Sequence, residues 1–455
     1  MPDWNLVTHL DTLVIGAGVS GLTAARLLTQ AGQGVTVLEA RERVGGRTWT
    51  DRSGAQPLDR GASWIHGVTD NPVAEAVRAF GMAEVEFTVG SYQAGGRPIA
   101  YFGPDGARLS EAAAASFIAD VETFSAELED TIAGSARGSS YGDAIEDTLL
   151  RLEWAEPRAD RVREFLRHRA EEQNGVDADL MDAHGLDEDA IDGDEVVFPD
   201  GYDRLAEHLA AGLDVRLGHV VERVLWAKEG VTVLTGEGLF TAARVVITVP
   251  LGVLTSPEFV LEPALPASHA KPLANLEMNA FEKIFLTFPE RFWDEGVYAI
   301  RHQGAEADWW HSWYDLSRVN GKPTLLTFAA GECGKEIRDW PAERVVASVL
   351  EQLRRLYGPN VPEPTEAVIT EWHRDPFSHG SYSYLAVGGD VGDPDRLAEP
   401  LAEGALHLAG EATWGDDPAT VTGAFFSGHR AAELVLGRPV PISDAWAPLR
   451  DAPSA

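Results

Sequence analysis

Three glycines near the start of the chain have the spacing of a phosphate-binding turn. Gly16, Gly18 and Gly21 form GxGxxG, directly after a short apolar run and directly before a sequence with helical periodicity. In such a turn the first glycine permits a tight bend, the second admits a pyrophosphate close to the backbone, and the third lets the helix pack on the strand. Glu39 ends the next apolar run, where its carboxylate can accept hydrogen bonds from ribose hydroxyls. The pattern predicts binding of an adenine dinucleotide.

A second motif distinguishes FAD from a nicotinamide cofactor. The segment 39–48, EARERVGGRT, resembles the second motif of the glutathione-reductase-like flavoproteins. The resemblance implies that Gly45 and Gly46 bring the backbone to the cofactor, that Arg47 pairs with phosphate, and that Arg41 is also a cofactor ligand. Arg47 could otherwise be an ordinary surface arginine, but the two flexible glycines before it favour the first interpretation.

The C-terminal segment 406–432, LHLAGEATWGDDPATVTGAFFSGHRAA, resembles the closing flavin motif of the flavin amine oxidase family, which contains the monoamine and polyamine oxidases. The resemblance implies that Gly410 and Glu411 follow a strand and lie near the ribitol and pyrophosphate. Amides around Thr420 and Val421 are expected to begin a helix and face the pyrimidine oxygens of the flavin, where the positive end of the helix dipole stabilises negative charge. The alternative for Glu411 is an exposed acid at a strand end.

The stretch DRGASWIHG, residues 59–67, resembles the GASWxHG sequence of polyamine oxidases of the animal and fungal type and of their plant peroxisomal relatives. The resemblance implies that His66 lies over the flavin in the amine tunnel. His66 is therefore expected to hydrogen-bond a substrate nitrogen or to help select its neutral form, since an imidazole titrates near working pH. A purely structural histidine is the alternative.

Two further residues carry the resemblance to amine oxidases. Lys283 lies in the otherwise apolar segment FEKIFLTF, where burial of an ammonium is costly. The equivalent lysine of the family holds a water against flavin N5; the alternative is a strand-edge lysine whose end reaches solvent. Tyr382, in the sequence GSYSY after Trp372, is expected to form one side of an aromatic cage over the flavin.

The chain departs from the monoamine oxidases at two positions. Ser381 stands where their covalent flavin-linking cysteine lies, so FAD is expected to be bound noncovalently. Thr420 replaces their second cage tyrosine, which makes the site less enclosed and more similar to that of spermine-type oxidases. Glu171 or Glu172 could bind a distal ammonium of a polyamine, since family members use a carboxylate nearby, but an ordinary helix surface explains both residues at least as well.

The motifs together give three sets of expected site residues. The cofactor-binding set is Gly16, Gly18, Gly21, Glu39, Arg41, Gly46, Arg47, Gly61, Ala62, Ser63, Trp64, Val221, Trp372, Gly410, Glu411, Thr420 and Val421. The catalytic set is Lys283, His66 and Tyr382, and the substrate-binding set is His66, Tyr382, Thr420, Glu171 and Glu172. No metal site is expected.

The resemblance implies a reaction in which hydride passes from the carbon beside an amine nitrogen to flavin N5, water hydrolyses the imine, and dioxygen reoxidises the flavin to give hydrogen peroxide. Only a neutral amine has the lone pair that drives hydride loss, so the site must favour the deprotonated reacting nitrogen. A polyamine is the expected substrate, and a monoamine, an amino acid or a cyclic amine is the rival within the same fold. A peptide-lysine demethylase and a flavoprotein without turnover are more distant rivals, because the sequence shows no helical tower insertion and its charge disfavours nucleosomal DNA.

The order of expected elements indicates an α/β and α+β fold. A Rossmann-like FAD-binding domain of the glutathione-reductase type is expected to be interleaved with a substrate domain of mixed sheet plus helices. The FAD-binding domain is expected in residues 1–75, 200–260 and 375–440. The substrate domain is expected in residues 76–199 and 261–374, with a helical subdomain at about 80–190.

Helical periodicity predicts helices over 110–132, 141–171 and 421–436. The acidic segment 175–195 is expected to be a solvated loop, which could border the entrance for a cationic substrate. It does not fit a calcium loop, because Ile191 occupies a position where such a loop needs an oxygen ligand.

The composition of the chain excludes several classes of partner and site. With 37 Lys and Arg against 72 Asp and Glu, the formal charge is −35, which repels nucleic acid and attracts cationic amines, although solubility alone is the stronger explanation. Cys333 is the only cysteine, so neither an internal disulfide nor a cysteine-based metal cluster is expected. The sequence has no stretch of roughly 18 uncharged apolar residues, and its first residues show no basic region followed by an apolar run, so neither a membrane span nor a signal peptide is expected. A cytoplasmic enzyme without membrane partners, monomeric or homodimeric, is expected.

Overall fold

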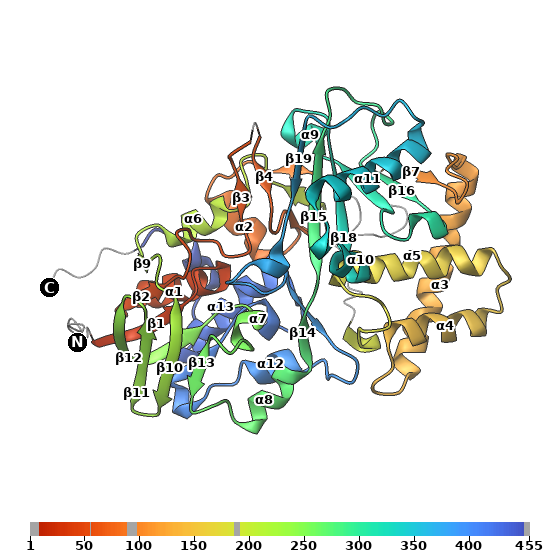
Figure 1. Cartoon of the computed structure of the whole chain (residues 1–455). Coiled ribbons are helices and arrows are strands. Elements are labelled where there is room, and N and C mark those ends of the chain that lie inside the picture. The colour runs from red at the N-terminus through yellow and green to blue at the C-terminus, as the bar shows by residue number, and fades with distance from the viewer. Residues whose placement is uncertain (1–8, 55, 89–97, 186–191, 450–455) are drawn as a thin grey trace.

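The computed structural model describes residues 9–54, 56–88, 98–185 and 192–449. Two large sheets form the body of the molecule, with helices packed around each of them (Figure 1). The first sheet lies on the side of the two chain termini, and the second lies across the molecule, next to a group of long helices (Figure 1).

The first sheet has the strand order β13-β10-β11-β12-β1-β2-β9, with β21 also paired to β12. Strands β1, β2, β9, β12 and β21 pair in parallel, and β11 is antiparallel to both of its neighbours. The apolar runs of β1 and β12 are fully buried, as expected for parallel strands that are covered on both faces. The strands are β1 (His9–Ile15), β2 (Val35–Leu38), β9 (Asp214–Arg216), β10 (Val221–Ala227), β11 (Gly230–Thr235), β12 (Gly238–Ile247), β13 (Val260–Glu262) and β21 (Leu406–Leu408).

Helices α1 (Val19–Gln30) and α13 (Val421–Leu436) pack against each other and against the first sheet. The bounds of α13 agree with the sequence prediction. Small residues let the two helices approach closely: a Cβ atom on Gly428 would lie 2.2 Å from the carbonyl oxygen of Ser20. The Oγ atoms of Ser20 and Ser427 lie 2.9 Å apart at the same crossing. This crossing places the N-termini of both helices at the cofactor turn and the C-terminal motif.

The second sheet has the strand order β19-β15-β18-β17-β16-β7. Helix α11 (Ala342–Tyr357) covers one of its faces, where an apolar stripe of the helix shares a buried core with strand residues such as Ile284 and Leu325. The strands are β7 (Ile99–Phe102), β15 (Phe281–Thr287), β16 (Ala299–His302), β17 (Ser312–Asp315), β18 (Thr324–Ala330) and β19 (Glu366–Ile369).

Three helices form a separate packed group beside the second sheet: α3 (Glu111–Gly134), α4 (Tyr141–Leu152) and α5 (Arg158–Asn174). The helical stretch predicted over 141–171 consists of two helices, because the chain turns between α4 and α5. Glu153 ends α4 in a left-handed conformation, and Pro157 precedes α5. A proline has no backbone N–H and disfavours a helical residue before it, so the helix stops although the apolar periodicity continues.

Short elements connect these layers. A small sheet of β5 (Trp64–Ile65), β8 (Val196–Val197) and β6 (Val85–Glu86) places the GASWIHG stretch beside the end of the acidic segment. The other short elements are β3 (Thr50–Asp51), β4 (Leu58–Asp59), β14 (Leu276–Met278), β20 (Ser383–Leu385), α2 (Pro72–Ala79), α6 (Arg204–Ala210), α7 (Leu251–Leu254), α8 (Ala267–Ala274), α9 (Ser317–Asn320), α10 (Gly331–Glu336) and α12 (Asp393–Leu397).

The acidic segment 175–195 is only partly solvated. Asp192 and Asp194 are exposed, whereas Asp182 and Glu195 are 1% and 0% exposed, so the prediction of a solvated loop is wrong for its two buried acids. Ile191, on which the argument against calcium depended, lies outside the described residues.

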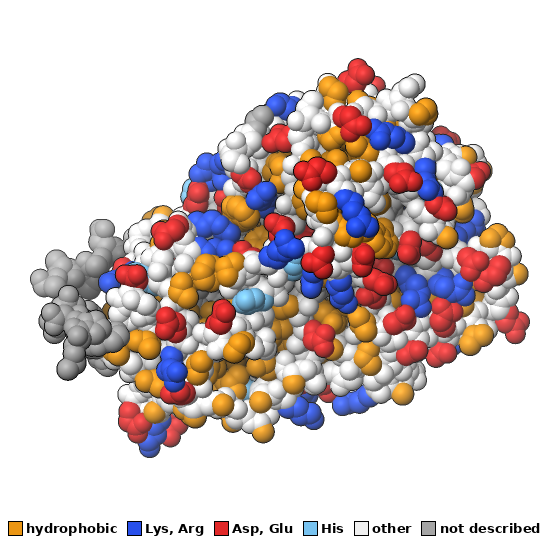
Figure 2. Space-filling view, viewed as in Figure 1, with side chains coloured by type: hydrophobic (Ala, Val, Ile, Leu, Met, Phe, Trp, Pro, Cys, Tyr) orange, Lys and Arg blue, Asp and Glu red, His pale blue; other side chains and the backbone are white. Residues whose placement is uncertain are grey.

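The surface carries both signs of charge. Figure 2 shows acidic and basic side chains interspersed over the visible face. Among the described residues, none of the helices has the length and apolar character needed to cross a membrane.

The crossing of α1 and α13 gives a stability prediction. We expect Gly428→Ala to lower the free energy of unfolding by about 1–3 kcal/mol, because the new methyl group overlaps a backbone oxygen rather than a flexible side chain. Gly134→Ala is the control, since no atom lies within 4 Å of its new Cβ, and it should change the free energy of unfolding by less than about 0.5 kcal/mol. Urea titration followed by tryptophan fluorescence measures both, and equal stability of the two variants would contradict this packing.

Candidate functional site

One cavity of about 500 Å³ is lined by residues from both large sheets and from α5. Its volume lies in the range of ligand-binding sites. All but two of the predicted site residues line it; the exceptions are Gly21 and Glu171. The motifs that were identified separately in the sequence therefore meet around one space.

Gly18 and Gly21 have different surroundings in the glycine-rich turn. Gly16 has φ +101°, and its N–H donates to the carbonyl oxygen of Leu38. A Cβ atom on Gly21 would lie 2.1 Å from the carbonyl oxygen of Gly16, so this glycine is needed for the contact between helix and strand. A Cβ atom on Gly18 would meet no protein atom within 4 Å, although Gly18 lines the cavity. The space in front of Gly18 fits a bound pyrophosphate.

Glu39 lies in the wall of the cavity with 6% of its surface exposed. Its carboxylate accepts hydrogen bonds from the backbone N–H groups of Ala17 and Arg41, at 2.7 and 2.9 Å. Burial raises the pKa of Glu39, and these backbone bonds oppose the rise. The two bonds fix the carboxylate at the end of β2, where each oxygen keeps a second lone pair for a ribose hydroxyl.

Two arginines of the second motif are already engaged by carboxylates. Arg47 donates through Nη1 to Glu411 Oε1 at 2.8 Å and to the carbonyl oxygen of Ser381 at 3.0 Å. Arg41 binds both oxygens of Asp375, at 2.8 and 2.5 Å. Pairing of Arg47 with a cofactor phosphate stays a prediction. The observed bonds connect the N-terminal motif to the C-terminal segments that contain Asp375, Ser381 and Glu411.

The N-terminus of α13 opens on the cavity. Thr420 is its N-cap, and the Thr420 hydroxyl accepts a hydrogen bond from the Gly423 N–H at 2.8 Å. Thr420 and Val421 both line the cavity, and a Cβ atom on the neighbouring cavity residue Gly410 would meet no protein atom within 4 Å. A helix N-terminus beside open glycine backbone suits the electronegative edge of a flavin.

Lys283 is buried in β15, an interior strand of the second sheet, with 6% of its surface exposed. The alternative of a strand-edge lysine that reaches solvent is therefore wrong. Its Nζ donates to the carbonyl oxygens of Asp59 and Gly61 at 3.1 and 2.5 Å and to Ser63 Oγ at 2.5 Å. Burial lowers the pKa of Lys283, and the charge of Asp59 opposes that shift. The ammonium thus holds the loop that precedes β5 against the second sheet.

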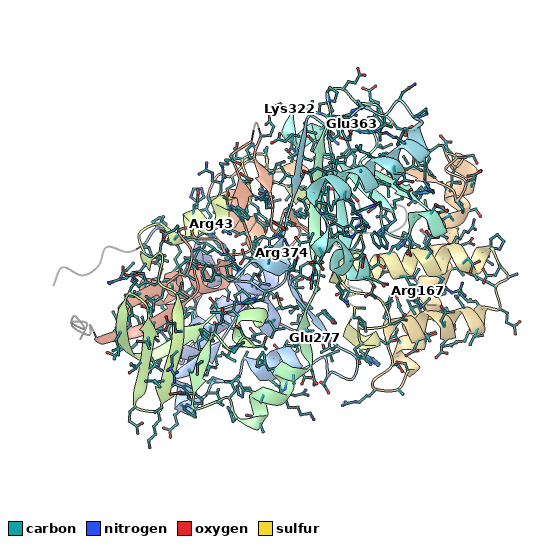
Figure 3. The ribbon with its side chains drawn as sticks, viewed as in Figure 1. Arg43, Arg167, Glu277, Lys322, Glu363 and Arg374 are labelled. Carbon is teal, nitrogen blue, oxygen red and sulfur yellow. The ribbon has the colours of Figure 1, made fainter. Side chains whose placement is uncertain are left out.

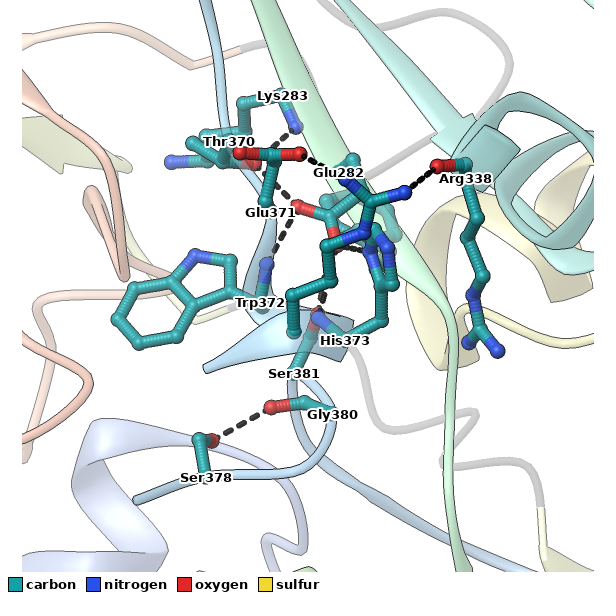
Figure 4. Close-up of polar contacts among 12 residues, drawn as sticks. Glu282, Lys283, Arg338, Thr370, Glu371, Trp372, His373, Ser378, Gly380 and Ser381 are labelled. Atoms are coloured by element: carbon teal, nitrogen blue, oxygen red, sulfur yellow. Dashed lines mark hydrogen bonds and ion pairs between the residues drawn. The ribbon is translucent and has the colours of Figure 1, made fainter. Parts of the chain in front are cut away.

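The neighbouring Glu282 holds the other wall in place (Figure 4). Its buried carboxylate accepts hydrogen bonds from Thr370 Oγ1 at 2.6 Å, from the Trp372 N–H at 2.9 Å and from His373 Nδ1 at 2.9 Å. These bonds fix the short turn η4 (Trp372–Arg374), whose last residue is labelled between the two sheets in Figure 3. Trp372 is held there and donates through Nε1 to the carbonyl oxygen of Arg60 at 2.9 Å.

Aromatic side chains line the middle of the cavity. Trp64 is parallel to His66, with ring centroids 6.5 Å apart, and Lys283 Nζ lies 5.5 Å from the centre of the Trp64 ring. Tyr382 packs on Phe281 at 5.5 Å, and both residues line the cavity. Lys283, His66 and Tyr382 therefore line the same aromatic part of the cavity.

His66 is paired with a carboxylate that no motif indicated. Its Nδ1 lies 2.6 Å from Glu195 Oε1. Desolvation of its ring in the cavity lowers the pKa of His66, but the hydrogen bond and charge of Glu195, together with the charge of Asp417, raise it above its usual value overall.

The two candidate carboxylates of α5 have different surroundings. Glu172 lines the cavity and accepts hydrogen bonds from Ser312 Oγ and from Tyr314 Oη at 2.5 Å, and His311 Nε2 lies 3.1 Å away. Although burial raises it, the pKa of Glu172 is lowered overall by these neighbours, and the residue is therefore ionised.

Glu171 lies one helical turn from Arg167, which Figure 3 labels, and does not line the cavity. Burial and nearby acids raise the pKa of Glu171 to about 9, so its side chain is neutral at neutral pH.

A possible cation site lies behind Glu172 and is empty. Ligand atoms of His168, Glu171 and His311 lie within 4.8 Å of one another. The two imidazole rings stack 3.7 Å apart with 5° between their planes. Lone pairs of parallel stacked rings do not converge on one point, so the arrangement does not suit a shared metal ion.

The charged residues Arg169, Glu195, Glu282 and Asp417 contribute to the site but were not singled out from the sequence. The sequence could have identified Glu282, because a second charged residue beside Lys283 in an apolar strand is costly to bury. Asp417 lies inside the C-terminal motif and lines the cavity. Arg169 lines the α5 side of the cavity, where its Nε donates to Gln173 Oε1 at 3.1 Å. Neither Arg169 nor Glu195 belongs to a local motif that could have identified it.

Substitutions at two glycines of the turn should affect cofactor affinity and protein stability separately. We expect Gly18→Ala to fold with unchanged thermal stability as apoprotein but to bind FAD at least about tenfold more weakly, because the methyl group occupies the open space before the turn. Gly21→Ala should instead lower the stability of the apoprotein by about 1–3 kcal/mol. Titration with FAD and thermal unfolding of the apoproteins measure the two effects. The assignment of the open space to FAD fails if Gly18→Ala binds FAD as tightly as the original protein.

Comparison with known proteins agrees with this geometry. The model of the family described as flavin containing amine oxidoreductase matches residues 19–436. Polyamine oxidase 4 of Oryza sativa subsp. japonica is 33% identical over 440 residues, which are 93% of this chain and 88% of that protein. A lysine-specific histone demethylase 1 homolog of the same organism is 33% identical over 448 residues, and the match covers 94% of this chain but 52% of that protein.

The fold is shared with a solved putrescine oxidase from a redesign of its cofactor binding. The TM-score is 0.79 and the identity is 23%, over 95% of this chain and 100% of that chain. Because the family match extends over most of its length and its glycine, carboxylate and helix-terminus groups meet around one cavity, the chain belongs to the flavin-containing amine oxidoreductases and is an FAD-dependent amine oxidase.

Proposed function

We propose that this amine oxidase acts on a polyamine. The observation that carries the proposal is the buried and ionised Glu172 in the wall of the cavity that also contains Lys283 and His66. An anionic group at this position can bind a second, protonated nitrogen of a substrate whose reacting nitrogen lies elsewhere in the cavity. The polyamine oxidase relatives support the same substrate class.

Different side chains of the cavity are proposed to perform different parts of the reaction. When bound, FAD accepts a hydride from the carbon beside the amine nitrogen and passes the electrons to dioxygen, which gives hydrogen peroxide. Trp64, Phe281 and Tyr382 form apolar walls that exclude water and favour the neutral form of the reacting nitrogen. His66 can take the proton that this nitrogen loses. Glu172 keeps the distant nitrogen charged and positioned.

FAD is proposed to be held without a covalent link. Ser381 lies in the cavity wall, and its hydroxyl donates to the carbonyl oxygen of Phe281 at 2.6 Å. A hydroxyl engaged in this way replaces the thiol that would form a flavin thioether. Acid precipitation that releases all FAD into the supernatant would support this proposal.

A second candidate substrate is an amine that carries a carboxylate, such as an amino acid. Arg169 favours it, because a buried guanidinium that lines the cavity is a carboxylate-binding group. Arg169 lies in the same helix as Glu172, so a substrate with an amine and an acid at its far end would contact both. Anaerobic mixing with polyamines, acetylated polyamines, monoamines and amino acids, read as loss of flavin absorbance, separates these candidates.

Glu172 gives a test of polyamine recognition. We expect Glu172→Gln to lower kcat/KM for spermidine by about 10- to 100-fold, because the charged hydrogen bond to the distal ammonium is lost. The kcat/KM for a monoamine of similar length should change by less than about threefold, since it has no second nitrogen. Glu171→Gln, one residue away and outside the cavity lining, should leave both values unchanged. Equal losses for spermidine and the monoamine would contradict a distal-ammonium role.

His66 gives a prediction about pH. An imidazole accepts a proton only when neutral, and the pKa of His66 is raised, so kcat/KM should rise as the pH increases through that raised pKa. His66→Ala should remove this part of the profile and leave only the rise that follows deprotonation of the substrate. Stopped-flow measurement of flavin reduction across the pH range checks it, and a profile unchanged in His66→Ala would remove the acid–base role.

A further inference from the structure

The sheet register places Glu195 directly opposite His66. Strands β5 and β8 pair antiparallel, with Trp64 opposite Val197 and Ile65 opposite Val196. The next pair in this register is His66 and Glu195. The observed distance of 2.6 Å between Nδ1 and Oε1 is therefore a cross-strand contact that the sheet itself fixes, although 129 positions separate the two residues in sequence.

The two partners have opposite exposure. Glu195 is fully buried, whereas the His66 side chain is 49% exposed and lines the cavity. The backbone of Glu195 is held on both sides: its N–H donates to Thr88 Oγ1 at 3.1 Å, and its carbonyl oxygen accepts from the Phe87 N–H at 2.8 Å. A carboxylate in a fixed and buried position can set the tautomer and orientation of the imidazole that it binds.

Other charged groups of the described residues also surround the imidazole. Asp417 from the loop before α13 adds a second negative charge, and Lys283 lies on the Trp64 ring that is parallel to His66. Glu86 on the neighbouring strand β6 is engaged by Tyr298 Oη at 2.8 Å and by the Thr88 N–H at 2.9 Å. Glu195 makes a direct hydrogen-bond contact with the ring, at 2.6 Å from Nδ1.

We propose that Glu195 is a positioning residue that holds Nδ1–H of His66 and so directs Nε2 to take a proton from the ammonium form of the substrate nitrogen. This inference rests on the proposed amine oxidation. In the step an N–H bond of the ammonium breaks and an Nε2–H bond forms, so the substrate nitrogen gains the free lone pair that hydride loss needs. The imidazolium that results is neutralised by the carboxylate behind it, as in other carboxylate–histidine pairs.

The first measurement needs no substrate. The ¹⁵N chemical shifts of the histidines in the FAD-bound protein, assigned to His66 by comparison with His66→Ala, report its tautomer. We expect the neutral ring to carry its proton on Nδ1. A neutral ring protonated on Nε2 would overturn the proposal. Because no amine is added, this result is independent of whether the proposed substrate is correct.

The second measurement uses Glu195→Gln, which keeps the side-chain volume but removes the charge. We expect the titration of His66 to move to lower pH and the rate of anaerobic flavin reduction by spermidine to fall by about 10- to 100-fold, within the range of general-base contributions. In the His66→Ala background the same substitution should change the rate by less than about threefold, because the two residues act as a unit.

Glu164→Gln is the matched control. Glu164 is a partly buried carboxylate that accepts from the Gly304 N–H at 2.6 and 2.8 Å and does not line the cavity, so its substitution should leave both the His66 titration and the rate unchanged. An equal loss of rate from Glu195→Gln with and without His66 would overturn the proposal, as would an unshifted titration of His66. If no amine reduces the flavin in the original protein, the proposed function fails. The tautomer measurement still shows whether Glu195 holds the proton on Nδ1 of His66.

Discussion

The buried ammonium of Lys283 is the interaction on which the geometry of the site depends. A charged group inside a protein is tolerated only if its hydrogen-bonding capacity is met, and Lys283 meets it with three acceptors from residues 59–63. Those residues belong to the stretch that leads into β5, whereas Lys283 belongs to the second sheet. Satisfying one ammonium therefore fixes a loop that follows the cofactor motif against the sheet that forms the opposite wall.

The hydrogen bonds of Lys283 to residues 59–63 also determine where the aromatic side chains of the cavity lie. Trp64 is next in the chain after the residues that Lys283 holds. The centre of its ring lies 5.5 Å from Lys283 Nζ, and the ring is parallel to the His66 imidazole. Glu282 does the same for the other wall, since its four hydrogen bonds fix the turn that carries Trp372. Two adjacent charged residues on opposite faces of one strand thus place aromatic groups on two sides of the same cavity. The cost of burying them is offset by the hydrogen bonds that they make with those loops.

The sequence predicted those parts of the site that depend on local backbone geometry. A glycine needed for close approach, such as Gly21, and an N-cap such as Thr420 act within a few residues, so their roles can be inferred from spacing. The pattern of residues 141–171 indicates helix, but it does not locate the turn between α4 and α5, which Glu153 and Pro157 make. Glu195 could not have been found in the same way. Its contact with His66 depends on the pairing of two short strands that are far apart in the chain, and a shift of one residue would place its side chain on the opposite face.

The contrast between Glu171 and Glu172 shows where sequence reasoning ends within a single helix. The two residues are the same chemically and adjacent, but successive side chains of an α-helix point about 100° apart. One carboxylate faces the cavity, where His311, Tyr314 and Ser312 stabilise its charge. The other lies among Asp177, Asp308 and Glu172, which favour its neutral form. The sequence predicts an acid at this point of the helix, but only the rotation of the helix against the second sheet decides which acid is charged and which one a ligand can reach.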